Sequence, residues 1–266
     1  MESSRRKFLK LAGITAAGIS AAPALTSFAK SHANEESHGG TPEGRIVDSK
    51  NALTAAHWGM VIDTRKLKTS RDLRPLIEAC HSIHNVPEFD NEDHEIKWIW
   101  EEGYEHVFPT RENKYLSEKM ERLPFLTLCN HCENPPCVRA CPTKATFQRE
   151  DGIVMMDFHR CIGCRFCMAA CPYGSRSFNF RDPRPGLEEI NEEFPTRMKG
   201  VVEKCNFCAE RLAKGQMPAC VEAADGAILF GDLGDPASDV RKALRENYTI
   251  RRNPSLGTEP SVYYIV

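Results

Sequence analysis

Long apolar runs, basic clusters and hydrolytic motifs are all scarce in this chain of 266 residues. Beyond the first 25 residues, no stretch is apolar and long enough to predict a membrane-spanning helix, which needs about 20 such residues. The formal net charge is −2, and this mild acidity argues against a nucleic-acid partner, which a basic surface would bind. No nucleophile–base constellation, phosphate-cradling glycine loop or metal-hydrolase motif is present. We therefore predict no substrate-converting site in this chain.

Cysteine, by contrast, is abundant, with twelve residues. Cys80 stands alone, and the others form the runs Cys129-Cys132-Cys137-Cys141, Cys161-Cys164-Cys167-Cys171 and Cys205-Cys208-Cys220. The middle run has the C-x2-C-x2-C-x3-C-P spacing, in which three thiolates bind one 4Fe–4S cluster and the fourth binds a second cluster. Gly163 leaves the tight turn of this run unobstructed, because it has no Cβ. Twelve cysteines at four per cluster predict three 4Fe–4S clusters.

Three other uses of these cysteines compete with this interpretation. Structural zinc sites usually take two C-x2-C pairs from separate knuckles, whereas here one run offers three thiolates at successive three-residue steps. A disulfide framework is typical of much smaller exported chains. Covalent haem requires C-x-x-C-H, but Glu133, Arg165 and Ala209 follow the three C-x-x-C pairs. Iron–sulfur clusters remain the best interpretation.

Residues 1–33 are typical of a signal peptide. A basic segment, Arg5-Arg6-Lys7-Phe8-Leu9-Lys10, precedes an apolar stretch over 11–25, and small residues offer cleavage after Ala29 or Ala33. The paired arginines resemble the twin-arginine export signal. That route carries folded proteins, which suits a protein loaded with clusters before export. We expect the mature chain on the periplasmic or extracytoplasmic face of the cytoplasmic membrane, without a transmembrane segment of its own.

The remaining sequence predicts short elements joined by long loops. Residues 34–55 form a flexible leader, residues 58–63 and 152–157 alternate like strands, and residues 208–214 are expected to be helical. Segment 88–120 is a charged insertion with interleaved aromatic residues, Trp98, Trp100, Tyr104 and Phe108. These side chains either pack over the domain, as aromatics mostly do, or form a docking surface. His131 is expected to lie behind the cluster ligands or in solvent.

From about residue 58 to the C-terminus, the cysteine runs resemble the four-cluster ferredoxin subunits of membrane-bound respiratory complexes. The closing segment 256–264 resembles the last strand of that family. The family has four cysteine runs, which pair first with fourth and second with third to form two ferredoxin-like modules. In this chain, Leu67, Ser70 and Leu73 (or Ser70, Leu73 and Leu76, counting back from Cys80) stand where the first run would have cysteines. Ala224-Asp225 replace the last cysteine and proline of the fourth run.

The missing cysteines are the four ligands of one cluster in the family's pairing, so we expect that site to be empty and packed with leucine. Cys80 is either the surviving ligand of the first run or an ordinary buried thiol. The resemblance implies three ligand sets. Set 1 is Cys80, Cys205, Cys208 and Cys220; set 2 is Cys129, Cys132, Cys137 and Cys171; set 3 is Cys161, Cys164, Cys167 and Cys141.

The predicted fold class is α+β, with tandem bacterial-type two-cluster ferredoxin-like modules, many loops and one lost cluster site. The outer module, with one cluster, spans residues 56–87 and 196–235. The inner module, with two clusters, spans residues 121–195, and residues 236–266 form a C-terminal extension. Residues 161–179 and 182–185 most resemble the exported iron–sulfur subunits of dissimilatory sulfur metabolism.

The resemblance implies an electron-transfer subunit rather than an enzyme with its own catalytic site. Its partners would be an integral membrane quinone-reactive subunit and a multihaem cytochrome c subunit. A second interpretation keeps the chemistry but places the chain in a molybdopterin oxidoreductase, of the tetrathionate or polysulfide reductase type. A third is a structural or redox-sensing module whose clusters only hold the fold.

Overall fold

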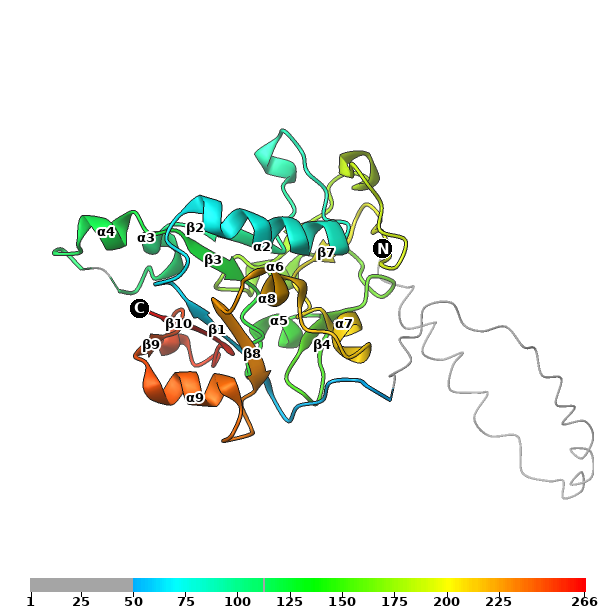
Figure 1. The fold of residues 1–266 in the computed structure, drawn as a ribbon. Coiled ribbons are helices and arrows are strands. Elements are labelled where there is room, and N and C mark those ends of the chain that lie inside the picture. The colour runs from blue at the N-terminus through cyan, green and yellow to red at the C-terminus, as the bar shows by residue number, and fades with distance from the viewer. Residues whose placement is uncertain (1–49, 112) are drawn as a thin grey trace, which may run out of the picture. The chain divides into compact units, whose positions relative to one another are not determined.

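The computed structural model describes residues 50–111 and 113–266. The predicted signal peptide, residues 1–33, and most of the predicted leader, residues 34–55, lie outside the described residues. The elements, in chain order, are β1 (Trp58–Asp63), α2 (Ser70–Ile83), η1 (Glu92–His94), β2 (Ile99–Glu102), α3 (Tyr104–Val107), α4 (Glu118–Glu121), β3 (Phe125–Leu128), α5 (Pro136–Arg139), β4 (Thr146–Gln148), β5 (Val154–Met156), α6 (Phe166–Ala169), β6 (Ser177–Phe178), η2 (Arg184–Gly186), β7 (Val202–Glu203), α7 (Ala209–Ala213), α8 (Ala219–Ala223), β8 (Ile228–Asp232), α9 (Asp239–Glu246), β9 (Thr249–Ile250), η3 (Pro254–Leu256) and β10 (Val262–Ile265). Figure 1 shows how short most of them are. The predicted α+β, loop-rich fold class is confirmed.

The largest sheet joins the two ends of the described chain. Its strand order is β8-β1-β10-β9, with β1 antiparallel to β8 and parallel to β10. Every residue of β1 is buried, so the sheet is covered on both faces. Val61 packs with Val240 and Ala243 of α9 on one face, whereas Met60 and Ile62 join the main core on the other. This alternation is the period of two expected for a strand.

Helix α2 covers the main core beside this sheet (Figure 1). Its start is fixed by a capping box in which Thr69 and Asp72 bond reciprocally, an arrangement that satisfies helix-end N–H groups. Leu73, Leu76 and Cys80 are its buried residues, at the three- and four-residue spacing of one helix face. That face packs against α8, and α2 thereby places Cys80 in the interior.

Three two-stranded antiparallel sheets complete the fold: β2–β3, β4–β5 and β6–β7. Strands β3, β5 and β7 each end shortly before one of the three cysteine runs. The expected strand over 152–157 is present as β5, and the expected helix over 208–214 is present as α7. The repeated unit is therefore a short strand that delivers the chain into a cysteine-bearing loop.

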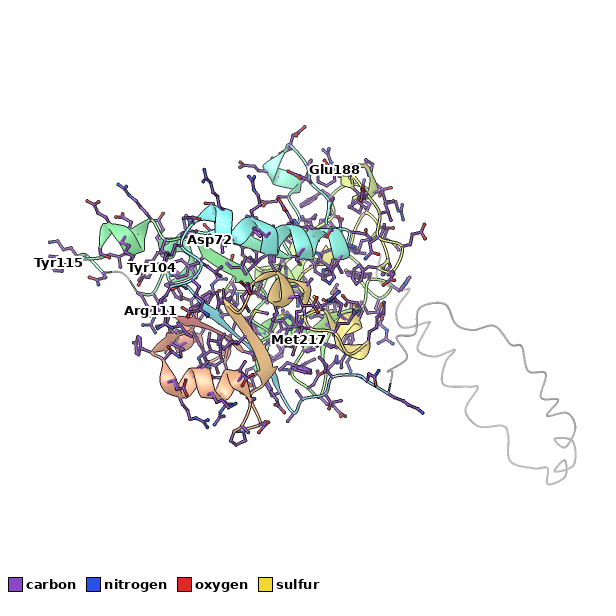
Figure 2. The ribbon with its side chains drawn as sticks, viewed as in Figure 1. Asp72, Tyr104, Arg111, Tyr115, Glu188 and Met217 are labelled. Carbon is purple, nitrogen blue, oxygen red and sulfur yellow. The ribbon has the colours of Figure 1, made fainter. Side chains whose placement is uncertain are left out.

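Segment 88–120 is integrated into the domain through β2, which pairs with β3. Trp98 and Phe108 are each 1% exposed and Trp100 is 9% exposed, so these aromatics pack inward rather than forming a docking surface. The exception is Tyr115, which projects beyond α4 and is 85% exposed (Figure 2). Within residues 50–111 and 113–266, no helix has the length and apolarity needed to span a membrane.

Candidate metal centres

Set 1 is assembled from three separate elements. Cys80 lies on α2, Cys220 lies on α8, and Cys205 and Cys208 flank the turn that leads into α7. All four are buried free thiols. Burial raises the pKa of the Cys80 thiol, and the thiols of Cys208, Cys205 and Cys220 raise it further. Because charge–charge effects of this kind weaken with distance, the other three thiols lie near enough to Cys80 to affect it.

The turn of set 1 is shaped to stabilise thiolates. Phe207 and Cys208 both have left-handed backbone conformations, with φ of 54° and 51°. The Phe207 N–H donates to Cys205 Sγ at 3.5 Å, and the Cys208 N–H donates to the side-chain oxygen of Asn206 at 2.8 Å. An N–H group aimed at sulfur favours the charged form of the thiol, which is the form that binds metal.

Set 2 surrounds a small enclosed cavity. Cys129, Cys132, Cys137 and Cys171 all line it, together with the side chain of Arg176. Burial, followed by the thiol of Cys129, raises the pKa of Cys132 to about 12, and Cys137 and Cys171 add to the effect. Four convergent sulfurs around one space make a donor set that suits an iron–sulfur cluster.

Set 3 is the most exposed of the three. Cys161 and Cys164 lie on the loop after β5, Cys167 lies on α6, and only Cys167 among them is fully buried. Burial raises the pKa of Cys167, and the thiols of Cys137, Cys161 and Cys141 contribute to the rise. Cys141 Sγ accepts the N–H of Thr146 at 3.4 Å. Cys141 and Cys167 are therefore neighbours, and Cys164 lies half-buried on the loop after β5.

Gly163 has the role expected of it. Its φ is +69°, and a Cβ at this position would lie 2.6 Å from the carbonyl oxygen of Gly200. Any other residue would be strained there and would also push the loop away from the segment before β7. The glycine therefore allows the set 3 loop to stay tightly curled.

Set 2 has electrostatic neighbours in both other sets. Cys129 of set 2 is, after burial, the strongest influence on the pKa of Cys205 of set 1. Cys137 of set 2 is likewise an electrostatic neighbour of Cys167 of set 3.

His131 joins the loops of sets 1 and 2. It is 1% exposed, so it is not in solvent. Its ring stacks on Phe207, with centroids 3.6 Å apart and planes 18° from parallel. Its Nδ1 accepts the N–H of Val154 at 3.1 Å, and burial lowers the pKa of His131 well below its usual value. The imidazole is therefore neutral, with its proton on Nε2.

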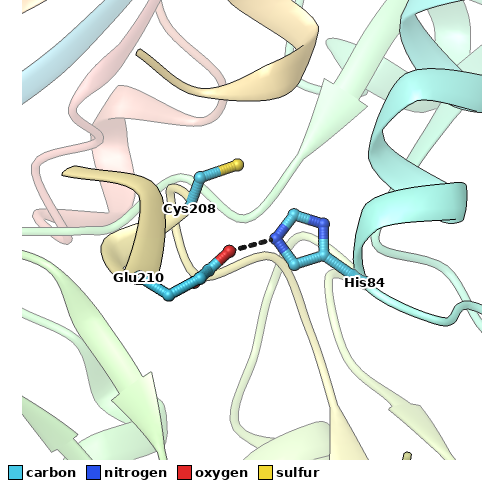
Figure 3. Close-up of side chains that lie close together, drawn as sticks. All are labelled: His84, Cys208 and Glu210. Atoms are coloured by element: carbon cyan, nitrogen blue, oxygen red, sulfur yellow. Dashed lines mark hydrogen bonds and ion pairs between the residues drawn. The ribbon is translucent and has the colours of Figure 1, made fainter. Parts of the chain in front are cut away.

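Two further side chains, His84 and Glu210, lie beside Cys208 of set 1. Figure 3 shows the ion pair between the histidine and the glutamate. His84 Nε2 lies 2.8 Å from Glu210 Oε1, and its Nδ1 donates to the Cys80 carbonyl at 2.8 Å. Both ring nitrogens are thus engaged by protein groups. The pair ties the end of α2 to the start of α7, and we assign it no metal of its own.

The leucines at the positions of the missing first-run cysteines are buried. Leu67, Leu73 and Leu76 are 4%, 0% and 2% exposed, and the idea that they fill a lost cluster site stays a prediction. Asp225 is exposed, and exposed Ser70 donates its hydroxyl hydrogen to Glu101 at 2.8 Å. Neither oxygen is therefore directed at a buried metal site.

Sequence reasoning missed several polar groups around the cysteines, namely Arg176, Lys204, His84 and Glu210. Lys204 directly precedes Cys205 and Arg176 follows Cys171 by five residues. Basic residues at such positions are usually solvated, so their burial depends on packing that spacing alone does not predict.

Comparison with known proteins shows the family of the chain. The model of the 4Fe-4S dicluster domain family matches residues 120–182, which hold the cysteine runs that begin at Cys129 and at Cys161. The chain is 42% identical to the Hdr-like menaquinol oxidoreductase iron-sulfur subunit 1 of Archaeoglobus fulgidus, over 98% of this chain and 97% of that protein. It is 34% identical to a subunit of the tetrathionate reductase of Salmonella typhimurium, over 100% and 89%. It is also 34% identical to the menaquinone reductase iron-sulfur cluster-binding subunit of Nitratidesulfovibrio vulgaris, over 78% and 88%.

Proposed function

This protein belongs to the family of iron–sulfur electron-transfer subunits of membrane-bound oxidoreductases, and from this premise we propose that it holds three 4Fe–4S clusters, one on each cysteine set. The observation that carries the proposal is the convergence of the four set 2 thiols on one cavity, with the set 1 thiols, and Cys141, Cys161 and Cys167 of set 3, close enough to affect one another electrostatically. When bound, such clusters supply reversible one-electron oxidation and reduction. The neighbouring sets then provide a path for electrons through the domain.

The cysteine sets along this path differ in how deeply their thiols are buried. The thiols of set 1 are all buried, whereas three of the four in set 3 are half-buried. Burial and exclusion of water are among the means by which a protein adjusts a cluster's potential. We propose that set 3, which lies nearest solvent, faces one redox partner, and that set 2 connects it to set 1.

We propose that this chain works in an extracytoplasmic, membrane-associated complex of dissimilatory sulfur metabolism. Residues 161–179 and 182–185 resemble DsrO, the iron–sulfur subunit of the DsrMKJOP complex. On that basis its partners are an integral membrane quinone-reactive subunit, similar to DsrP or NrfD, and a multihaem cytochrome c similar to DsrJ. The relatives named for menaquinol and menaquinone support the quinone-reactive partner. The twin-arginine segment supports export of the folded chain.

A second candidate is the electron-transfer subunit of a tetrathionate or polysulfide reductase. The full-length similarity to the tetrathionate reductase subunit of Salmonella typhimurium favours it. So does 42% identity to a component of the polysulfide reductase of Wolinella succinogenes, over 52% of this chain and 64% of that protein. The two candidates share the cluster chemistry and differ in the partner that accepts or donates electrons.

Anaerobic purification of the native complex tests both the number of clusters and the choice of redox partners. Three clusters predict about twelve irons per chain, with rapid and reversible reduction by a quinol. About sixteen irons would place a cluster in the lost site, and hardly any iron would end the proposal. Covalent haem in the complex favours the first set of partners, and a molybdopterin favours the second.

A further inference from the structure

Two buried cations lie beside the cysteine sets without a carboxylate partner among the described residues. Arg176 is 5% exposed and Lys204 is 2% exposed, and no ion pair involves either of them in the part of the chain that the structure covers. Arg197 shows the contrasting arrangement, because its guanidinium pairs with Glu203 at 2.6 Å and both side chains are fully buried. An unpaired buried charge is costly, so Arg176 and Lys204 require another source of negative charge.

Arg176 lies between sets 2 and 3. Its side chain lines the cavity of set 2. One guanidinium nitrogen donates to the hydroxyl of Thr146 at 3.2 Å, and Nη2 has no hydrogen-bond partner within the described residues. The thiols of Cys137, Cys167 and Cys129, which belong to sets 2 and 3, raise the pKa of Arg176 against the effect of burial. Over residues 50–111 and 113–266, the negative groups that act on this cation are therefore cysteine sulfurs of two different sets.

Lys204 occupies the corresponding place between sets 1 and 2. Its ammonium donates to the carbonyl oxygens of Cys205, at 2.6 Å, and of Val154. Val154 in turn donates its N–H to His131, which lies on the loop of set 2. The positive charge of Lys204 also lowers the pKa of Cys205, opposing the larger rise due to burial and to Cys129. Carbonyl groups satisfy the hydrogen bonds of this lysine but do not neutralise it.

Arg252 is the third buried cation without a carboxylate partner in the described residues, and its position differs. It is 4% exposed and donates to the carbonyl of Val107 at 3.2 Å. Its guanidinium lies 5.3 Å from the ring centroid of Tyr173. Arg252 therefore differs from Arg176, which lines the set 2 cavity, and from Lys204, which donates to the Cys205 carbonyl.

We propose that Arg176 and Lys204 are positioning residues that keep the potentials of the clusters on either side of them high enough for electrons to pass. This inference rests on the proposed function. A cluster bound by four thiolates is negative, and reduction makes it more so, so a fixed cation in a low-dielectric interior favours the added electron. Arg176 acts on sets 2 and 3, and Lys204 acts on sets 1 and 2. Set 2, between both cations, is the cluster most favoured for reduction.

The test is a redox titration of the full-length, anaerobically loaded protein, followed by electron paramagnetic resonance so that each cluster is resolved. Arg176→Gln should make reduction of the set 2 and set 3 clusters at least about tenfold less favourable, a drop of about 59 mV for a one-electron couple, and should leave set 1 unchanged. Lys204→Met should have the same effect on sets 1 and 2 and leave set 3 unchanged. Arg139→Gln and Lys199→Met remove exposed charges of the same kind elsewhere in the chain and should change none of the three potentials.

Variants that retain charge separate electrostatics from packing. Arg176→Lys should keep both the iron content and the potentials close to those of the unaltered protein, even if Arg176→Gln loads less iron. Equal loss of iron in the lysine and glutamine variants would overturn the proposal, because it would show that the site needs the shape of arginine. Unchanged potentials in fully loaded Arg176→Gln, or equal shifts in all three clusters, would also overturn it. The iron content of the unaltered protein reports separately on the proposed function.

Discussion

The ring of His131 lies face to face with the ring of Phe207, and the two residues belong to different cysteine runs. His131 stands between Cys129 and Cys132, and Phe207 stands between Cys205 and Cys208. The stack therefore fixes the loop of set 1 against the loop of set 2. Phe207 also meets Phe230 of β8 edge-on, with centroids 5.2 Å apart. Through these contacts the spacing of two cluster sites depends on one aromatic side chain.

Removing that side chain should loosen both sites. Phe207 is 1% exposed, and truncating a buried phenylalanine to alanine typically costs about 3–5 kcal/mol. We expect Phe207→Ala to lower the melting temperature of the loaded protein and to release iron from set 1 first. Calorimetry and iron analysis would measure the two effects. Tyr115→Ala, at an 85% exposed position, should change the stability by less than about 0.5 kcal/mol.

Cys80→Ala tests whether the isolated upstream cysteine completes set 1. The variant should lose one cluster's worth of iron, about four atoms, or retain a three-iron cluster with a distinct paramagnetic signal. Ser82→Ala, an exposed change on the same helix, serves as the control. Iron content and spectra identical to those of the unaltered protein would show that Cys80 is an ordinary buried thiol.

Restoring the absent cysteine of the fourth run should not restore a cluster. Ala224 is 7% exposed and ends α8, which packs against the leucine face of α2. We expect Ala224→Cys to bind no additional iron, because Leu73 and Leu76 occupy the space and supply no ligand. A gain of about four irons per chain in this single variant would contradict the packing argument.

The buried pair of Arg197 and Glu203 gives a prediction about stability alone. Glu203 also accepts from Trp98 Nε1 at 2.9 Å and from Asn179 Nδ2 at 2.5 Å. Glu203→Gln would leave the arginine charge uncompensated, and breaking such a pair costs about 3–5 kcal/mol. Denaturant unfolding of the loaded protein would measure this loss.

A surface pair provides the matched comparison for that measurement. Arg211 Nη2 lies 2.6 Å from Glu222 Oε2, but the glutamate side chain is 52% exposed. Glu222→Gln should cost no more than about 1 kcal/mol. Equal losses at the two positions would show that burial does not set the strength of the Glu203 interaction.

Local sequence patterns predicted the parts of the fold that are fixed by neighbouring residues. The strand over 58–63 is present over the full predicted range. Gly163, between Cys161 and Cys164, has the left-handed conformation that its turn requires. The three cysteine sets were inferred only through a family resemblance, because pairing between runs is a long-range property. The structure places the four set 2 thiols around one cavity, and the three complete ligand sets stay a prediction.

What the sequence did not reveal depends on contacts between distant segments. Arg176 and Lys204 look like ordinary surface cations until the loops of two sets close around them. Trp98 in the charged segment 88–120 was open to two interpretations, and its buried ring donates a hydrogen bond to Glu203, which lies far along the chain. His131 was likewise undecided, because its stacking partner belongs to another run.

The assembly of set 1 from α2, α7 and α8 has a consequence for the order of events in the cell. Cys80 emerges from the ribosome long before Cys205, Cys208 and Cys220, and the parallel pairing of β1 with β10 needs the last residues of the chain. Set 1 therefore cannot be assembled until the segment that carries Cys220 has been synthesised and has packed against α2.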